Sequence, residues 1–177
     1  MTEKSLFAGF GGQGIISLGQ IWVYCAMLEG KNVTFFPFYG AEKRGGVARA
    51  GVVVSDEEIA SPLVTSPDSV LVMNTDSLPI CEDIVKPNGL MVINSTLVKT
   101  LPKRKDIKVL PVEASGLAEK VGHVRYANMV ALGAMAKATG ALKLTEIETI
   151  LKKFFPPNKH KFVPENIEAI RAGFEAI

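Results

Sequence analysis

The 177-residue sequence predicts an α/β fold: a single Rossmann-like, three-layer domain over residues 1–177, with a mostly parallel, mixed sheet and a helical C-terminal third. Three observations predict it. Short apolar or β-branched runs alternate with helical segments as far as residue 110. The continuous apolar runs at 69–73 and 90–93 are typical of strands covered on both faces. Beyond residue 110 only helical segments follow.

The first predicted unit is strand, turn, helix and strand. Residues 5–8 form a short apolar run that meets a glycine-rich turn, and residues 15–29 read as a helix that ends at Gly30. Residues 33–36 are β-branched and aromatic, which favours a second strand, and Pro37 is expected to end it. A βαβ unit is therefore complete within about 36 residues, as expected for such a unit.

The next segments predict a mixed sheet and then helices. Residues 47–54 read as a strand, and the polar residues 55–58 lead to Ile59, so we expect an antiparallel hairpin at this point. The helix predicted at 77–85 accepts Pro79 in its first turn. The remaining elements are a last strand at 107–110 and helices at 116–121, 126–139, 145–155 and 165–176.

Composition excludes several classes of protein. The net charge of +2 is spread along the chain without a dense basic block, so we expect no nucleic-acid partner. No run of about 18 apolar residues or signal-peptide core appears, which predicts no membrane association and a cytoplasmic location. Cys25 and Cys81 lie in apolar helical patterns and read as buried thiols. With two cysteines, and with His123 and His160 far from other metal ligands, we expect no metal or cluster in this chain.

The first candidate site is the glycine-rich turn after the first strand. Gly9, Gly11 and Gly14 satisfy the G-x-G-x-x-G pattern between a strand and a helix, where backbone N–H groups can hold an anion. Gly12 allows close approach of a ligand or chain, and Gln13 adds a side-chain amide. The alternative is that these glycines only permit a tight turn.

The surroundings of this turn weaken a dinucleotide interpretation. NAD and FAD folds need an acidic residue near the end of the second strand to hold a ribose hydroxyl. Residues 35–38 are Phe-Phe-Pro-Phe, so that partner is missing.

The second candidate site is the polar, glycine-rich stretch 39–46 between two apolar strands. Arg44 could hold a phosphate or carboxylate with two parallel hydrogen bonds, and Gly45 with Gly46 could form an anion-binding nest. The alternative is a structural ion pair between Arg44 and Glu42. Further along the chain, Asn128 could cap a helix or contribute to a site, and the structural role is slightly favoured.

Five stretches carry a family resemblance. They are Gly-Gly-Gln-Gly at 11–14, Tyr-Gly-x-Glu-x-Arg-Gly-Gly at 39–46, Ser61-Pro62, Pro87-x-Gly89 before a strand ending in Asn94, and Asn128-Met129 followed by Leu132-Gly133-Ala134. With these stretches the chain resembles, over nearly its whole length, the gamma subunit or gamma domain of the 2-oxoacid:ferredoxin oxidoreductases of pyruvate, 2-oxoisovalerate and 2-oxoglutarate.

The resemblance implies an enzyme subunit that is not catalytic alone. Such enzymes decarboxylate a 2-oxoacid on thiamine diphosphate, pass electrons through [4Fe-4S] clusters to ferredoxin, and form acyl-CoA. The resemblance implies thiamine diphosphate and Mg in alpha and beta subunits, clusters in a ferredoxin-like delta subunit, and CoA as co-substrate, with no cofactor in this chain. Its candidate ligand-binding residues are Gly9, Gly11, Gly12, Gln13, Gly14, Tyr39, Glu42, Arg44, Gly45, Gly46 and Asn128.

Two rival interpretations remain open at this point. A purely structural subunit would use the same surfaces for assembly without binding a ligand. A stand-alone nucleotide-binding oxidoreductase would bind NAD or flavin at the glycine turn. The lack of an acidic residue after the second strand argues against this interpretation. The sequence does not identify the 2-oxoacid.

Overall fold

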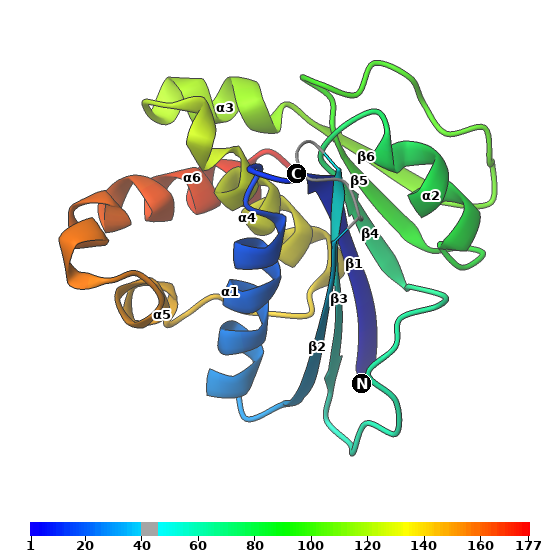
Figure 1. Cartoon of the computed structure of the whole chain (residues 1–177), viewed down its shortest axis with the longest axis horizontal. Coiled ribbons are helices and arrows are strands. Elements are labelled where there is room, and N and C mark those ends of the chain that lie inside the picture. Colours follow the sequence, from blue (N-terminus) through cyan, green and yellow to red (C-terminus); the bar gives the residue numbers. More distant parts are fainter. Residues whose placement is uncertain (40–45) are drawn as a thin grey trace.

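Among the residues that the computed structural model describes, 1–39 and 46–177, six strands form one sheet in the order β2-β3-β1-β4-β5-β6 (Figure 1). The strands are β1 (Thr2–Phe10), β2 (Asn32–Tyr39), β3 (Val47–Ser55), β4 (Ser69–Val72), β5 (Leu90–Asn94) and β6 (Lys108–Val112). β1, β4, β5 and β6 are parallel, while β3 is antiparallel to both β1 and β2. The expected mixed sheet is confirmed.

The expected hairpin after β3 is wrong. The antiparallel partners of β3 are β2 and β1, and residues 56–68 contain no strand. Pro62 and Pro67 lack the N–H group that a sheet ladder needs, which disfavours a strand in this segment. Because β3 lies between β1 and β2, the two strands of the first βαβ unit are not neighbours in the sheet.

Both edge strands contain a proline. β2 continues through Pro37 to Tyr39, so the expectation that Pro37 ends the strand is also wrong. β6, at the opposite edge, contains Pro111. An edge strand has one side without a hydrogen-bonding neighbour, so it accepts a residue that lacks an N–H donor.

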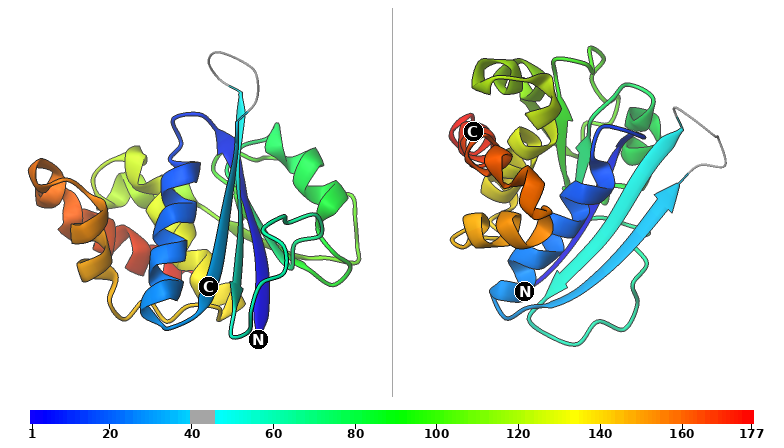
Figure 2. Two further views of the ribbon diagram at one scale, coloured as in Figure 1. Left: turned by 60° about the horizontal axis from the view of Figure 1, so that its bottom comes forward. Right: turned by 60° about the vertical axis from the view of Figure 1, so that its left-hand side comes forward.

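Helices cover the sheet unequally (Figures 1 and 2). In the part of the chain that the structure describes, α2 (Ser77–Ile84) is the one helix on one face, whereas the other face carries a layer of five. That layer comprises α1 (Ile15–Leu28), α3 (Ala114–Val121), α4 (Ala127–Thr139), α5 (Ile147–Phe154) and α6 (Val163–Glu175), joined in part by the short turns η1 (Val124–Tyr126) and η2 (Pro157–Phe162). Along the described residues, no helix combines the length and the hydropathy needed to cross a bilayer.

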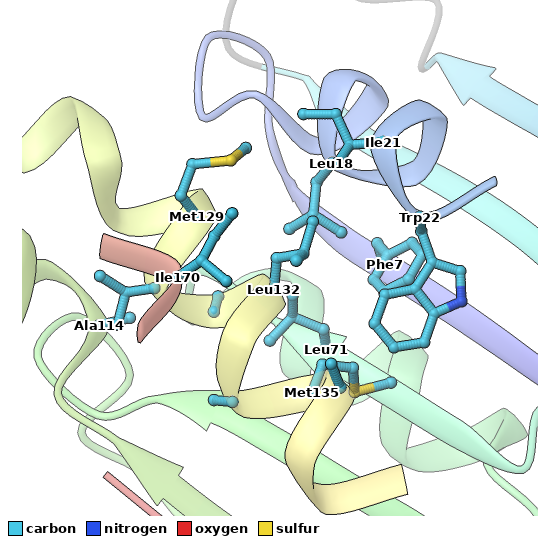
Figure 3. Packing of buried hydrophobic residues seen from close by; sticks show 14 of the residues in the cluster. Phe7, Leu18, Ile21, Trp22, Leu71, Ala114, Met129, Leu132, Met135 and Ile170 are labelled. Carbon is cyan, nitrogen blue, oxygen red and sulfur yellow. The ribbon is translucent and has the colours of Figure 1, made fainter. Parts of the chain in front are cut away.

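Side chains alternate between the two faces of the sheet along each strand, so the domain has two hydrophobic cores, one on each face. On β1, Phe7 points toward α1 and α4, whereas Leu6 and Ala8 point toward α2. Figure 3 shows the larger core, where the rings of Phe7 and Trp22 meet edge to face with centroids 5.5 Å apart. Because both faces of these strands are buried, their sequences are apolar at successive positions.

Glycines set the distance between α4 and α6. A Cβ added to Gly133 would lie 1.9 Å from the Ile170 carbonyl oxygen, and one added to Gly173 would lie 1.8 Å from the Val130 carbonyl oxygen. The two backbones therefore touch directly at these glycines. This close crossing fixes α4, whose first turn forms one wall of the candidate site.

Candidate functional site

The candidate site lies where the connections from two neighbouring parallel strands diverge. The chain leaves β1 toward α1 on one face of the sheet and leaves β4 toward α2 on the opposite face. In open α/β sheets such a divergence opens a crevice at the carboxyl ends of the strands, where ligands bind. The glycine turn at residues 9–14 occupies this position (Figure 1).

Three positions of the turn require glycine, each for its own structural reason. A Cβ at Gly9 would lie 2.7 Å from both the Gln13 Oε1 and the Ile15 Cδ1 atoms. Gly12 has φ +97° with open space around it, and Gly14 has φ +74°. Both φ values are in the region that other residues rarely adopt. The turn therefore needs glycine for packing at one position and for backbone conformation at two.

The side-chain amide of Gln13 points inward. Its Oε1 accepts from the Phe10 N–H at 2.7 Å, and its Nε2 donates to the Met73 carbonyl at 3.3 Å. Oε1 also lies 3.5 Å from the Nδ2 donor of Asn74. Gln13 thus closes the turn and joins it to the end of β4, and both polar ends of its side chain are occupied.

Backbone donors remain available on the turn. The N–H groups of Gly12 and Gly14 donate to no acceptor in the described part of the chain. α1 begins at Ile15, so its first-turn N–H groups, which have no partner inside the helix, lie beside them. Together with the positive end of the helix dipole, these groups form a local environment suited to an anion.

The second predicted site meets the first through the backbone. The Gly11 N–H donates to the Gly46 carbonyl oxygen at 3.1 Å, which brings the two glycine-rich stretches together. Tyr39 lies at the end of β2 with 70% of its surface exposed. The predicted residues Glu42, Arg44 and Gly45 lie outside the described residues.

Asn128 connects α4 to the glycine turn. It is the second residue of α4, whose N-cap is Tyr126, so the expected capping role is wrong. Its Nδ2 instead donates to the Gly14 carbonyl oxygen at 3.4 Å across 114 positions of sequence. The structure therefore brings Asn128 next to the turn.

A cavity of about 360 Å³ opens beside the turn. Gly12, Gln13, Gly14 and Asn128 line it, together with Met73 at the end of β4 and Arg125 before α4. Backbone donors, an amide and one guanidinium thus face a partly apolar space. The cavity is suited to a ligand that carries both an anionic or carbonyl group and an apolar arm.

Sequence reasoning missed Arg125. Its guanidinium lies 4.8 Å from the ring centroid of Tyr126 and 4.3 Å from that of Phe162, and it donates to the Tyr126 hydroxyl at 2.7 Å. An arginine next to a tyrosine at a helix start is a weak signal by itself. The contact with Phe162, 37 positions later, depends on how α6 packs against α4.

Neither cysteine can serve a cluster in this chain. Cys25 lies in α1 on one face of the sheet, and Cys81 lies in α2 on the other. Burial raises the pKa of each thiol to about 12. Within residues 1–39 and 46–177, no three His, Cys, Asp or Glu side chains gather as metal ligands would. These residues do not fit a metal centre.

The strand order also argues against a dinucleotide site. In a dinucleotide fold the acidic ribose ligand ends the strand adjacent to β1. Here the neighbours of β1 are β4 and β3, and β3 runs in the opposite direction. The strand that follows α1 is β2, which lies at the sheet edge and ends in Phe38 and Tyr39.

Comparisons with known proteins agree with this architecture. A family model described as pyruvate ferredoxin/flavodoxin oxidoreductase matches residues 4–176. The 2-oxoglutarate synthase subunit KorC of Methanothermobacter marburgensis is 36% identical over 184 residues, covering 100% of this chain and 97% of that one. The ketoisovalerate oxidoreductase subunit VorA of Methanothermobacter thermautotrophicus is 36% identical over 170 residues, but the chain spans only 35% of its length.

Solved structures give the same result. The gamma subunit of a keto/oxoacid ferredoxin oxidoreductase from Geobacter sulfurreducens superposes with a TM-score of 0.87 at 29% identity, covering 99% of this chain and 96% of that one. A 2-oxoglutarate:ferredoxin oxidoreductase from Magnetococcus marinus, solved with 2-oxoglutarate, coenzyme A and succinyl-CoA bound, gives 0.89 at 25% identity over 99% of this chain and 31% of that one. The chain belongs to the pyruvate ferredoxin/flavodoxin oxidoreductase family, as a gamma-type component.

Proposed function

We propose that this chain completes the active site and helps to place CoA in a thiamine-diphosphate-dependent 2-oxoacid:ferredoxin oxidoreductase. The whole complex would oxidatively decarboxylate a 2-oxoacid to acyl-CoA and pass the electrons to ferredoxin. Alpha and beta subunits would hold thiamine diphosphate and Mg, and a ferredoxin-like delta subunit would hold the [4Fe-4S] clusters. Such partners would supply the redox and decarboxylation chemistry, because the cysteines of this chain do not fit a cluster.

The observation that carries the proposal is the cavity beside the glycine turn. Gly12 and Gly14, whose N–H groups donate to no acceptor among the described residues, line it together with Asn128 and Arg125 at the divergence of β1 and β4. CoA combines phosphates with amide carbonyls and an apolar arm, a combination that such a lining can hold. The Magnetococcus marinus relative contains coenzyme A and succinyl-CoA, which supports this choice of ligand.

The first experiment tests the assembly. We expect affinity purification of the tagged chain from its native cell to recover thiamine-binding and ferredoxin-like chains, identified by peptide sequencing. The purified complex should reduce ferredoxin with a 2-oxoacid only when CoA is present. Recovery of the chain alone would contradict the proposal, as would ferredoxin reduction at the same rate with and without CoA.

The second experiment separates ligand placement from a purely structural role. Gln13 supports the structural alternative, since its amide is fully used in closing the turn. Gly12→Ala adds a methyl group on the open side of the turn, and Arg44→Ala removes a predicted anion ligand. If the chain places CoA, both variants raise the KM for CoA per assembled complex, even though the positive φ at Gly12 makes Gly12→Ala less stable. A structural subunit predicts reduced yield with unchanged turnover per complex.

A further inference from the structure

The connection from β5 into the edge strand β6 concentrates positive charge. Residues 95–108 contain five cations and one acidic residue, a net charge of +4, whereas the whole chain carries +2. The rest of the chain is therefore net negative, and the small overall charge hides a local basic segment. This segment runs beside α2 at the sheet edge opposite β2 (Figure 1). Such a charge asymmetry predicts a partner of opposite sign.

Arg104 fixes the segment and contributes no free charge. Its guanidinium donates to the Glu82 and Val85 carbonyl oxygens at 2.8 and 2.6 Å, and to both carboxylate oxygens of Asp106 at 2.9 and 2.7 Å. Its backbone N–H donates to the Glu82 carboxylate at 2.7 Å. The middle of the segment is thus attached to the end of α2, and two carboxylates next to it are already occupied.

Four lysines of the segment remain without an acidic partner. Lys99, Lys103, Lys105 and Lys108 are all exposed, and none lies within 4.0 Å of an acidic oxygen among residues 1–39 and 46–177. Asp83, on α2, acts electrostatically on Arg104 and pairs with none of the four. The lysines therefore present uncompensated positive charge on a segment whose backbone is held in place.

The surface around these lysines is open. None of them lines the cavity beside the glycine turn or the other principal cavities of the described part of the chain. Leu101, between Lys99 and Lys103, is 70% exposed, and the segment contains no aromatic residue on which a base could stack. An open basic surface with an exposed leucine fits a protein better than a small anion or a nucleic acid.

We propose that residues 95–108 form a docking surface for an acidic electron-acceptor protein, the ferredoxin of the proposed function. The inference rests on that function. Ferredoxin holds its cluster on cysteine thiolates, so negative charge lies at the part of the acceptor that must approach the complex. A cluster-bearing partner subunit supplies the electrons, while this surface attracts and orients the acceptor.

The composition of the surface favours a partner that binds and leaves. Lysine is depleted from the core of stable interfaces, whereas weak electron-transfer contacts are small. A permanently bound subunit needs a larger apolar patch than Leu101 supplies. Exposed lysines instead increase the rate of association with an acidic protein, and salt weakens this effect.

Ferredoxin kinetics of the assembled complex test the surface. The double variant Lys103→Glu/Lys105→Glu should raise the KM for ferredoxin about ten-fold at low salt. Its rate of methyl viologen reduction with the same 2-oxoacid and CoA should not change, because this small cation needs no basic docking surface. The KM of wild type for ferredoxin should rise with ionic strength. An unchanged KM for ferredoxin in the variant, or an equal loss with methyl viologen, would overturn the inference.

Two further double variants separate this surface from the net charge of the chain. Lys120→Glu/Lys153→Glu makes the same change in charge at exposed positions of α3 and α5, on the other face of the sheet. Its KM for ferredoxin should stay near that of wild type. Lys103→Gln/Lys105→Gln removes charge without reversing it, so it should raise the KM less than the two glutamates do. An equal increase in the α3–α5 control would show that the surface is not specific.

Crosslinking locates the contact directly. A carbodiimide joins a lysine to a carboxylate without a spacer, so it is applied to the complex mixed with ferredoxin from the same cell. We expect peptide mapping to find Lys99, Lys103, Lys105 or Lys108 joined to ferredoxin, with less product at high salt. Crosslinks from ferredoxin to other lysines alone, or from these four to another subunit of the complex, would contradict the proposal.

The methyl viologen assay distinguishes failure of the surface from failure of the proposed function. It measures acyl-CoA formation without a protein acceptor. If acyl-CoA forms but Lys103→Glu/Lys105→Glu leaves the KM for ferredoxin unchanged, the surface is wrong while the function stands. If no 2-oxoacid yields acyl-CoA, the proposed function is wrong, and crosslinking alone decides whether an acidic redox protein docks on residues 95–108.

Discussion

The Asn128 Nδ2 atom donates to the Gly14 carbonyl oxygen at 3.4 Å, and a Cβ placed on Gly14 would lie 2.3 Å from the same nitrogen. This contact joins the glycine turn to the first turn of α4. Since both residues line the cavity beside the turn, their packing sets its shape. The absence of a side chain at Gly14 is therefore required by the neighbour as well as by the backbone.

Gly14→Ala should destabilise the chain more than Gly12→Ala. Both positions have positive φ, which costs a residue with a Cβ about 1–2 kcal/mol. Only at Gly14 does the new methyl group also displace Asn128, so its total cost should reach about 3 kcal/mol. Urea unfolding followed by circular dichroism measures both variants. Equal costs would show that the Asn128 contact does not constrain the turn.

A double-mutant cycle isolates this contact. Asn128→Ala alone should cost about 1 kcal/mol through its lost hydrogen bond. Combined with Gly14→Ala, it removes the steric conflict, so the double variant should be more stable than the sum of the two costs predicts. If the two losses in the free energy of unfolding simply add, the turn relaxes without involving α4.

Gly133→Ala should be among the most damaging single-methyl changes in the chain. The added Cβ would meet the Ile170 carbonyl oxygen at 1.9 Å, and backbone cannot move aside as a side chain can. We expect a loss of about 3 kcal/mol, measured by urea unfolding. Gly116→Ala in α3 is the control: its Cβ would make only an ordinary 3.7 Å contact with Thr96, and alanine favours a helix by up to about 1 kcal/mol.

Much of the fold was predictable because its signals are local. Apolar runs on β4 and β5 reflect burial on both faces, and Gly30, with φ +75°, lies just beyond the end of α1, as the sequence predicts. The antiparallel partners of β3 are not predictable from local signals, because they depend on which strand lies next to β1. That choice is made by packing between segments far apart in the chain.

The site was predictable only in part for a similar reason. Gly12 and Gly14 are visible in the sequence because a positive φ needs glycine. The inward orientation of Gln13 depends on Met73, and the role of Arg125 depends on Phe162. Such partners are brought together by the sheet order and by the α4–α6 crossing, which no local pattern encodes.

The two thiols should be unreactive in the folded chain. Burial raises the pKa of Cys25 and of Cys81 to about 12, so almost no thiolate is present at neutral pH. Iodoacetamide at neutral pH should label neither cysteine in native protein and both after unfolding in guanidinium, as counted by mass spectrometry. Rapid native labelling of either residue would show that its helix opens readily from the sheet.

Glu3 should give the chain a stability component that is lost as pH rises. Burial raises the pKa of this carboxyl, against the opposing hydrogen bond from the Ser69 hydroxyl at 2.5 Å. The folded state then binds a proton more tightly than the unfolded state, so the free energy of unfolding falls as pH increases from about 4.5 toward the raised pKa.

Glu3→Gln removes this titration while retaining an oxygen that can accept from Ser69. The stability of Glu3→Gln relative to wild type should therefore increase between pH 4 and pH 7, as measured by urea unfolding at both values. Other carboxyls titrate equally in both proteins and cancel in the difference. A pH-independent difference for Glu3→Gln would mean that the carboxyl is as well solvated folded as unfolded.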